Sequence, residues 1–489
     1  MKLAFKLKSE EKGNKNINKK LLYFITFLYA ISTGEVAPIE LFDIARRIKY
    51  SYYSRIMNEI YSLGIGWKYG MANACEIVAN KLKSKDLLTS QLSMKFAQIL
   101  RLGDSISFFL KHEFTVMLKL YTAEYDRHVE SMKMLMGIYS AIASTAIFMI
   151  SASMLMIMIS GESNSSTLIL VSFTVILGLG SFVYIMYKIF PRDELLDESG
   201  GITKKYKILF YVCSVASIAI SSILILTNII DRLLALAIGS IPLICLGFYA
   251  RRLENHILSM NIWYPTFIRQ FGEVYATIGS VGGALRSTLK NDFGPLNKQL
   301  HAMLNRIENR VTLEESFELF SKESGNAIIT AGNEVVATAI TKGSDMTIVG
   351  NIISEVTITL NELYNKRIQV AKVFESTLFI MHILSLAVLS FMNSLILLFS
   401  NIFDVNTQEI IQLGLIDPEL MNSIIPIVVL ALSIINGLAT KIARGGLYKT
   451  AWFNIGMFIL IGSIVVYTAD IFMDKLLGEI IDLSIDELI

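Results

Sequence analysis

The 489-residue chain has few of the residues that build cross-linked or reactive sites. It contains 3 cysteines and 5 histidines, with no Cys-x-x-Cys pair. Three cysteines give no disulfide framework, and the scattered histidines give no metal-ligand spacing. Seven prolines and 30 glycines exclude a collagen-like or low-complexity chain. Charged residues make up only 18%, against about 25% in an ordinary soluble domain.

Apolar residues are what the chain has in abundance, at 53% with a mean hydropathy of +0.54. This composition indicates an integral membrane protein. Most of its long apolar runs reach the roughly 20 residues that a helix needs to cross a bilayer, and backbone groups in lipid must pair within the helix. We therefore expect about seven transmembrane helices, at 135–160, 167–187, 208–228, 233–250, 376–399, 423–439 and 450–469.

The basic residues predict how these helices are oriented. With the N-terminus in the cytoplasm, the cytoplasmic segments are 1–134, 188–207, 251–375 and 440–449. They hold 42 of the 44 lysines and arginines, and only Arg232 and Lys475 fall outside. The outer loop 400–422 and the tail 474–489 carry mainly acidic residues instead. This split follows the positive-inside rule and places the C-terminus outside the cell.

A short apolar run at 21–31 offers an alternative reading of the N-terminus. Seven lysines precede it, which is the shape of a signal peptide. Eleven helical residues cover only about 16 Å, too little to span the membrane. We expect this run to be the first helix of a cytoplasmic domain, preceded by a solvated lysine-rich tail.

The predicted fold is an all-α integral membrane protein with two cytoplasmic helical-bundle domains. The expected parts are a first cytoplasmic domain 1–134, a four-helix membrane block 135–250, a second cytoplasmic domain 251–375, a three-helix membrane block 376–473 and an acidic extracytoplasmic tail 474–489. The cytoplasmic domains are similar at an offset of about 240 residues, which predicts an internal repeat. In both, a long helix is closed by a glycine, Gly103 or Gly343, and 125–133 matches 364–372.

The chain lacks the motifs of an energy-converting or catalytic protein. No G-x-x-x-x-G-K-[ST] is present, and Gly445 to Thr450 echoes it without the spacing that cradles phosphate. No catalytic, cofactor or metal site is predicted, and we expect no enzymatic activity. His382 lies inside the fifth predicted span, either as a functional ionisable group or as a neutral imidazole bonded across helices to a serine or an asparagine, such as Asn436 or Asn454.

Four segments resemble the type II secretion F superfamily of membrane platform proteins. They are GEVAPIELFDIARR at 34–47, LRLGDSISFFL at 100–110, KGSDMTIVGNIISEV at 342–356 and YNKRIQVAKVFEST at 364–377. The length and the four-plus-three split of spans are most similar to the archaeal archaellum assembly J family. Platforms of archaeal adhesive pili or type II secretion-like systems share these signatures. A transporter or a membrane enzyme would need intramembrane polar or catalytic groups that the sequence barely offers.

The resemblance implies a set of partners. Such platforms contact a hexameric secretion ATPase, help to lift pilin or archaellin subunits out of the membrane, and form a homodimer in contact with membrane lipids. No nucleic-acid partner is expected.

Nine basic residues next to the predicted spans are the candidate partner-binding residues, and we call them the basic collar. They are Arg127, Lys133, Arg251, Arg252, Lys366, Arg367, Lys372, Lys441 and Arg444. They either serve only topology and lipid contact, or dock an acidic rim of the ATPase. The second interpretation treats them as exposed, so that reversing Lys366 and Arg367 to glutamate is expected to leave stability nearly unchanged.

Overall fold

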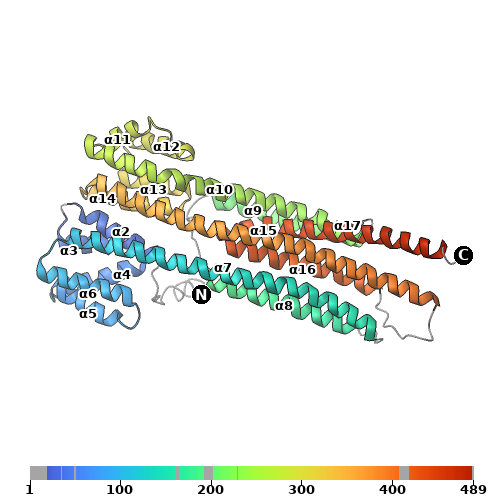
Figure 1. The fold of residues 1–489 in the computed structure, drawn as a ribbon. Helices are drawn as coiled ribbons and strands as arrows, with labels where there is room; N and C mark the ends of the chain where they lie inside the picture. The colour runs from blue at the N-terminus through green and yellow to red at the C-terminus, as the bar shows by residue number, and fades with distance from the viewer. Residues whose placement is uncertain are drawn as a thin grey trace. The chain divides into compact units, whose positions relative to one another are not determined.

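The computed structural model describes residues 19–34, 36–48, 51–160, 165–191, 202–227, 230–406 and 418–486. These residues form helices joined by turns, with no strand among them (Figure 1). The chain divides into two compact units. The described residues of unit 1 come from Met1–Arg127 and His256–Tyr364, and those of unit 2 from His128–Glu194, Ile202–Asn255 and Asn365–Ile489.

Three long helices contribute residues to both units, and the other helices belong to one. The shared helices are α7 (Ile106–Ser160), α10 (Arg232–Ile278) and α15 (Met346–Asn406). Unit 1 also contains α2 (Lys19–Ser32), α3 (Pro38–Ala45), α4 (Ser51–Tyr61), η1 (Ser62–Gly66), α5 (Met71–Leu82), α6 (Leu87–Leu102), α11 (Val281–Thr288), η2 (Gly294–Leu296), α12 (Asn297–Glu308), α13 (Leu313–Ser324) and α14 (Ala327–Thr341). Unit 2 also contains α8 (Ser165–Ile189), α9 (Ile202–Thr227), α16 (Pro418–Arg444), η3 (Tyr448–Thr450) and α17 (Ala451–Asp486).

Unit 1 repeats one helical pattern twice, as the sequence predicts. Helices α2 to α7 are matched in order by the end of α10, then α11 to α15. The matching helices α7 and α15 begin at Ile106 and Met346, which lie 240 residues apart. Before each of them a glycine takes the left-handed conformation that ends a helix, at φ 72° for Gly103 and 66° for Gly343. The internal repeat is therefore confirmed.

Helix α2 is a core element of unit 1. Every residue from Leu21 to Ile31 is buried, and the helix packs against α14 of the second repeat. An ion pair of 2.9 Å between Lys342 and Glu40 adds a second contact between the repeats. The apolar run 21–31 is thus a bundle helix and not a membrane span, whereas residues 1–18 of the lysine-rich tail before it lie outside the described residues. The two predicted cytoplasmic domains meet in one compact unit.

Six helices of the described chain are long and apolar enough to cross a membrane. They contain Ile106–Ile157, Ser166–Ile189, Arg232–Ile278, Met346–Ile396, Ser423–Arg444 and Tyr448–Met473. Each includes one of the predicted spans. The remaining predicted span, 208–228, falls on α9, whose described apolar stretch, Tyr211–Thr227, is shorter. The protein is an all-α, multi-pass membrane protein.

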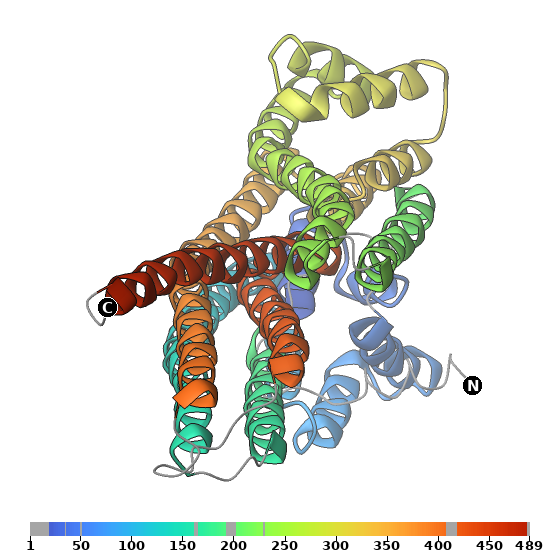
Figure 2. The ribbon, with the colours of Figure 1, turned by 90° about the vertical axis from the view of Figure 1, so that its right-hand side faces the viewer.

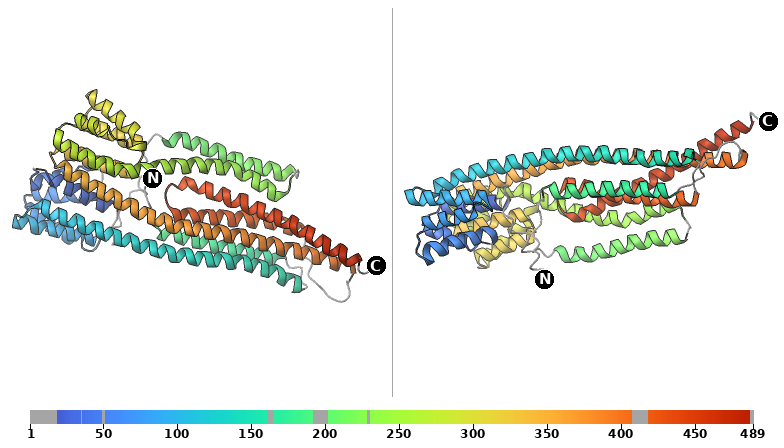
Figure 3. Two further views of the ribbon diagram at one scale, coloured as in Figure 1. Left: turned by 45° about the horizontal axis from the view of Figure 1, so that its top comes forward. Right: turned by 90° about the horizontal axis from the view of Figure 1, so that it is seen from below.

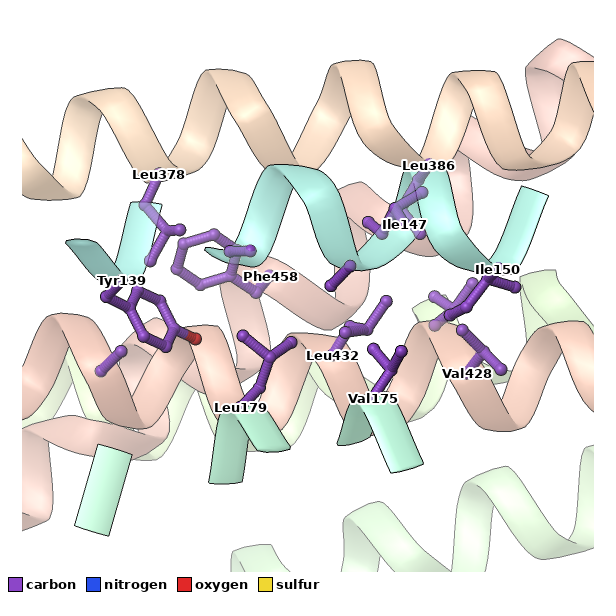
Figure 4. Close-up of a cluster of buried hydrophobic side chains, with 14 of the residues drawn as sticks. Tyr139, Ile147, Ile150, Val175, Leu179, Leu378, Leu386, Val428, Leu432 and Phe458 are labelled. Atoms are coloured by element: carbon purple, nitrogen blue, oxygen red, sulfur yellow. The ribbon is translucent and has the colours of Figure 1, made fainter. Parts of the chain in front are cut away.

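The core of unit 2 lies between α7, α8, α15, α16 and α17. Tyr139, Leu378, Leu432 and Phe458 are buried there, and Figure 4 shows their side chains directed toward one another. In lipid, close packing rather than exclusion of water holds such helices together. Helix α9 lies alongside α10 (Figures 2 and 3), where the Ser217 hydroxyl donates to the Gly239 carbonyl.

Candidate functional site

The turn between α16 and α17 brings together three buried charged side chains of the described part of unit 2, Glu254, Arg367 and Lys441. Helix α16 ends at Arg444, and Gly445 and Gly446 follow with φ of 72° and 74°. Glycine is needed at both positions, because it adopts positive φ without strain and because a side chain would collide with its neighbours. A Cβ on Gly445 would lie 2.7 Å from the guanidinium carbon of Arg367, and one on Gly446 would lie 2.7 Å from a carboxylate oxygen of Glu254. We call this turn and its charged neighbours the junction.

Arg367 closes the C-terminal end of α16. Its Nε and Nη2 donate to the carbonyls of Ala443 and Ile442 at 3.0 and 2.9 Å. Its Nη1 donates to the Pro191 carbonyl at 2.6 Å. These acceptors include carbonyls at a helix end, which have no partner within the helix and carry its negative dipole. Arg367 is only 1% exposed, so its charge is part of the interior.

Glu254 of α10 holds the start of the next segment. Its Oε2 accepts a hydrogen bond of 3.0 Å from the backbone N–H of Leu447, just before η3. The ammonium of Lys441 lies 3.5 Å from the same oxygen and also donates to the Gly445 carbonyl. Both side chains are almost fully buried. A buried ion pair of this kind is costly to break from one side, since the remaining charge is left uncompensated.

Two further cations border the junction. Arg444 pairs with Glu375 at 3.9 Å, and the guanidinium of Arg251 lies 4.9 Å from the ring centre of Phe453. Together these contacts connect the α16–α17 turn to α10 and α15. The arrangement can fix the angle between helices and hold positive charge in place.

The structure separates the basic collar into three groups. Exposed side chains are those of Arg127, Lys133, Arg252, Lys366 and Lys372. Arg251 and Arg444 are half-buried, and Arg367 and Lys441 are buried. The expectation that Arg367 is exposed is wrong, because its guanidinium is used to close α16. A helical spacing of 3 and 4 residues places it between the buried Tyr364 and Ala371, and this spacing was the signal available in the sequence.

Neither Glu254 nor the role of the two glycines is predicted by the sequence. Glu254 is a single acid following Arg251 and Arg252 at the end of an apolar run. Its partners Lys441 and Leu447 lie almost 200 residues further along the chain and no local pattern links them. The sequence around Gly445 and Gly446 gives no local signal that the two glycines make room for Arg367 and Glu254.

His382 belongs to a separate polar network within the bundle. Its Nδ1 accepts from the Asn436 amide at 3.1 Å, and the Asn436 oxygen accepts from the Tyr139 hydroxyl at 2.7 Å. Its Nε2 lies 3.3 Å from the Phe458 carbonyl, which places the ring proton on Nε2. The predicted bond across helices to Asn436 is present, and this geometry fits a neutral imidazole.

No metal-ligand cluster occurs among the residues that the structure describes. Cys75 in α5 is fully buried, and burial raises the pKa of its thiol to about 12. Such a thiol stays protonated and is a packing group rather than a nucleophile.

Comparison with known proteins gives distant relatives. No family model matches the chain, and no solved structure matches it. It is 23% identical over 339 residues to the Flagella accessory protein J of Methanococcus voltae, covering 65% of this chain and 60% of that protein. The same protein of Methanocaldococcus jannaschii is 23% identical over 359 residues, covering 69% and 63%. The chain thus spans less than two thirds of the length of either relative. It is a distant relative of the archaeal flagella accessory protein J.

Proposed function

We propose that this protein is the membrane platform of an archaeal filament-assembly machine, in which it serves archaellum assembly. The observation that carries the proposal is its likeness to two proteins named Flagella accessory protein J. The all-α, multi-pass architecture and the repeated bundle of unit 1 support it. The platform has no catalytic activity of its own and couples a hexameric cytoplasmic ATPase to the movement of archaellin or pilin subunits.

The proposed orientation has unit 1 in the cytoplasm, the N-terminus inside and the C-terminus outside. Its support is the distribution of basic residues, 42 of which would face the cytoplasm. Cysteines placed at Ser166 and Lys111 test it with a membrane-impermeant thiol reagent. Ser166 should react in intact cells and Lys111 only after lysis. Labelling of the Lys111 position in intact cells would contradict the orientation.

The exposed part of the basic collar is the proposed docking surface for the ATPase. Arg127 and Lys133 lie on α7, and Lys366 and Lys372 lie on α15. Both helices continue without a break from the repeats of unit 1 into apolar sequence. A partner held there by complementary charge would act directly on helices that enter the membrane. Arg367 and Lys441 belong to the junction and take no part in docking.

A charge-reversal pair tests this surface. Lys366→Glu with Lys372→Glu should weaken co-purification of the ATPase at low salt by about tenfold or more, because rim charges govern association. Lys111→Glu with Lys119→Glu, also exposed on α7, is the matched control and should bind as the parent does. If the first pair of substitutions leaves ATPase binding unchanged, or if only the control loses binding, the ATPase docks elsewhere. A null strain that still swims but lacks adhesive pili would assign the platform to the pilus instead.

A further inference from the structure

A cavity of about 600 Å³ lies among α8, α9, α10, α16 and α17. Its walls are mainly aliphatic side chains, among them Leu236, Leu243, Leu430, Ile434 and Leu438. Serines also line it, but the hydroxyl of Ser217 donates to the Gly239 carbonyl and that of Ser240 to the Ala237 carbonyl. The polar groups of the wall are therefore satisfied by the protein, and the cavity presents hydrocarbon to an occupant.

One end of the cavity is different from the rest. Lys441, Tyr187 and Tyr448 line it, and the two tyrosine rings lie 6.4 Å apart. Two more lysines adjoin the tyrosines in sequence, Lys188 in the last turn of α8 and Lys449 in η3. Tyrosine and lysine at the end of an apolar space are typical of the boundary between hydrocarbon and lipid headgroups.

The chemistry of the lining selects among the occupants that a membrane can supply. A phospholipid offers both chemistries that the lining shows: a flexible hydrocarbon chain for the aliphatic wall, and a negatively charged headgroup for the part lined by Lys441, Tyr187 and Tyr448.

We propose that this cavity binds one chain of an anionic membrane phospholipid, with the phosphate beside Lys188 and Lys449. The aliphatic wall takes the hydrocarbon chain, and the tyrosine pair lies at the level of the glycerol and headgroup. Because Lys441 lines the cavity and also pairs with Glu254, the lipid contacts the junction. It fills the space between the α9–α10 and α16–α17 hairpins, so it acts as a structural ligand of the membrane part.

Photolabelling of the full-length protein in nanodiscs tests the proposal. The nanodiscs contain equal parts of phosphatidylcholine and phosphatidylglycerol, and the probe is a phosphatidylglycerol with a diazirine on one chain. Label should concentrate on the α10, α16 and α17 segments that line the cavity. Leu438→Trp fills the cavity and should abolish this label. The matched control Ile427→Trp lies on the same helix, is 63% exposed and does not line the cavity, and it should keep the label.

The headgroup is tested by Lys188→Gln with Lys449→Gln. This variant should lower the preference for phosphatidylglycerol over phosphatidylcholine by at least about fivefold, the effect of one lysine near an anionic surface. Lys133→Gln with Lys372→Gln should leave the preference unchanged. Melting temperatures close to that of the parent show that the variants fold.

Three results would overturn the proposal. Label spread evenly over all apolar helices and unaffected by Leu438→Trp would mean that the lipid is bulk bilayer. Equal labelling by phosphatidylcholine and phosphatidylglycerol probes would remove the headgroup assignment. A photoreactive residue at position 438 that captures another polypeptide in cells, and no lipid, would mean that a protein segment occupies the cavity.

Discussion

The two repeats of unit 1 share their helix boundaries and differ in their cores. Asp86 and Asn326, 240 residues apart, both cap the helix that follows, and they accept from the backbone N–H groups of Thr89 and Ile328. In the first repeat the neighbouring core contains Phe24, which stacks on Tyr53. In the second repeat the matching residue is Tyr264, whose hydroxyl donates to Asn333 at 3.0 Å.

The second repeat replaces apolar packing by a network of asparagines. Asn333 also donates to Ser321 at 2.9 Å, and Asn326 donates to Asn261 at 2.6 Å. All four side chains are buried. The position of the first repeat that matches Asn333 is Ser93, whose buried hydroxyl has no hydrogen-bond partner in the described part of the chain. The same succession of helices thus tolerates two kinds of core, provided that the helix ends are kept.

The largest expected effect on stability is at one of two matching arginines, which lie on α7 and α15, the matching helices of the two repeats. Arg127 on α7 is exposed and pairs with Glu124, whereas Arg367 on α15 is buried against helix-end carbonyls. Arg367→Glu should lower the free energy of unfolding by about 3–5 kcal/mol, because it places a carboxylate against carbonyl oxygens. Arg127→Glu should change it by no more than about 0.5 kcal/mol.

The free energy of unfolding of both variants is measured by denaturation in detergent, with proteolysis reporting the unfolded fraction. Arg367→Lys serves as a second control and should fall between them, since one ammonium cannot reach three carbonyls that a planar guanidinium serves. Similar small losses for Arg127→Glu and Arg367→Glu would contradict the structural role of Arg367.

Local signals explain what could be predicted from the sequence. The apolar runs, the closing glycines Gly103 and Gly343, and the burial of 21–31 depend on residues near one another in the chain. The junction depends on residues far apart, since Arg367 meets Pro191 and Ala443, and Glu254 meets Lys441. A single sequence carries no record of such pairs. A basic residue next to a membrane span is usually explained by topology alone. This explanation applies equally to Lys366 and Arg367, so it does not separate the exposed side chain from the buried one.

The asparagine network gives the next largest effect and separates the two cores. Asn333→Ala should cost about 1–3 kcal/mol, because it leaves the buried Tyr264 hydroxyl without its acceptor. Ser93→Ala at the matching position should be neutral or slightly stabilising, since it removes an unsatisfied hydroxyl. Hydrogen exchange of the α6 and α14 amides reports the stability of each repeat. Equal losses at the two positions would mean that the repeats have equivalent cores.

Substitution of the closing glycines tests the helix ends, which the two repeats share. Gly103 and Gly343 both have positive φ, and nothing lies within 4 Å of a Cβ built on either. Replacement by alanine should therefore cost only the conformational term, about 1–2 kcal/mol at each site. Gly445→Ala should cost more, because its Cβ would also displace Arg367. The melting temperatures of the three variants rank their losses of stability. Unequal losses of stability at Gly103 and Gly343 would show that the two helix ends are not equivalent.

The smallest expected effect is a coupling energy between two core positions, measured by exchanging the core aromatics of the two repeats. Tyr264→Phe removes one hydrogen bond and should cost about 1 kcal/mol. Phe24→Tyr inserts a buried hydroxyl beside apolar neighbours and should cost about 1–3 kcal/mol, unless an acceptor is supplied. Phe24→Tyr combined with Ser93→Asn supplies the acceptor that the second repeat uses, so the double variant should be more stable than the sum of the single changes predicts. A coupling energy of at least about 0.5 kcal/mol in this double-mutant cycle would show that the first repeat can accept the polar core of the second. Strict additivity would mean that Phe24 and Ser93 do not meet as Tyr264 and Asn333 do, and that the two cores differ in geometry as well as in chemistry.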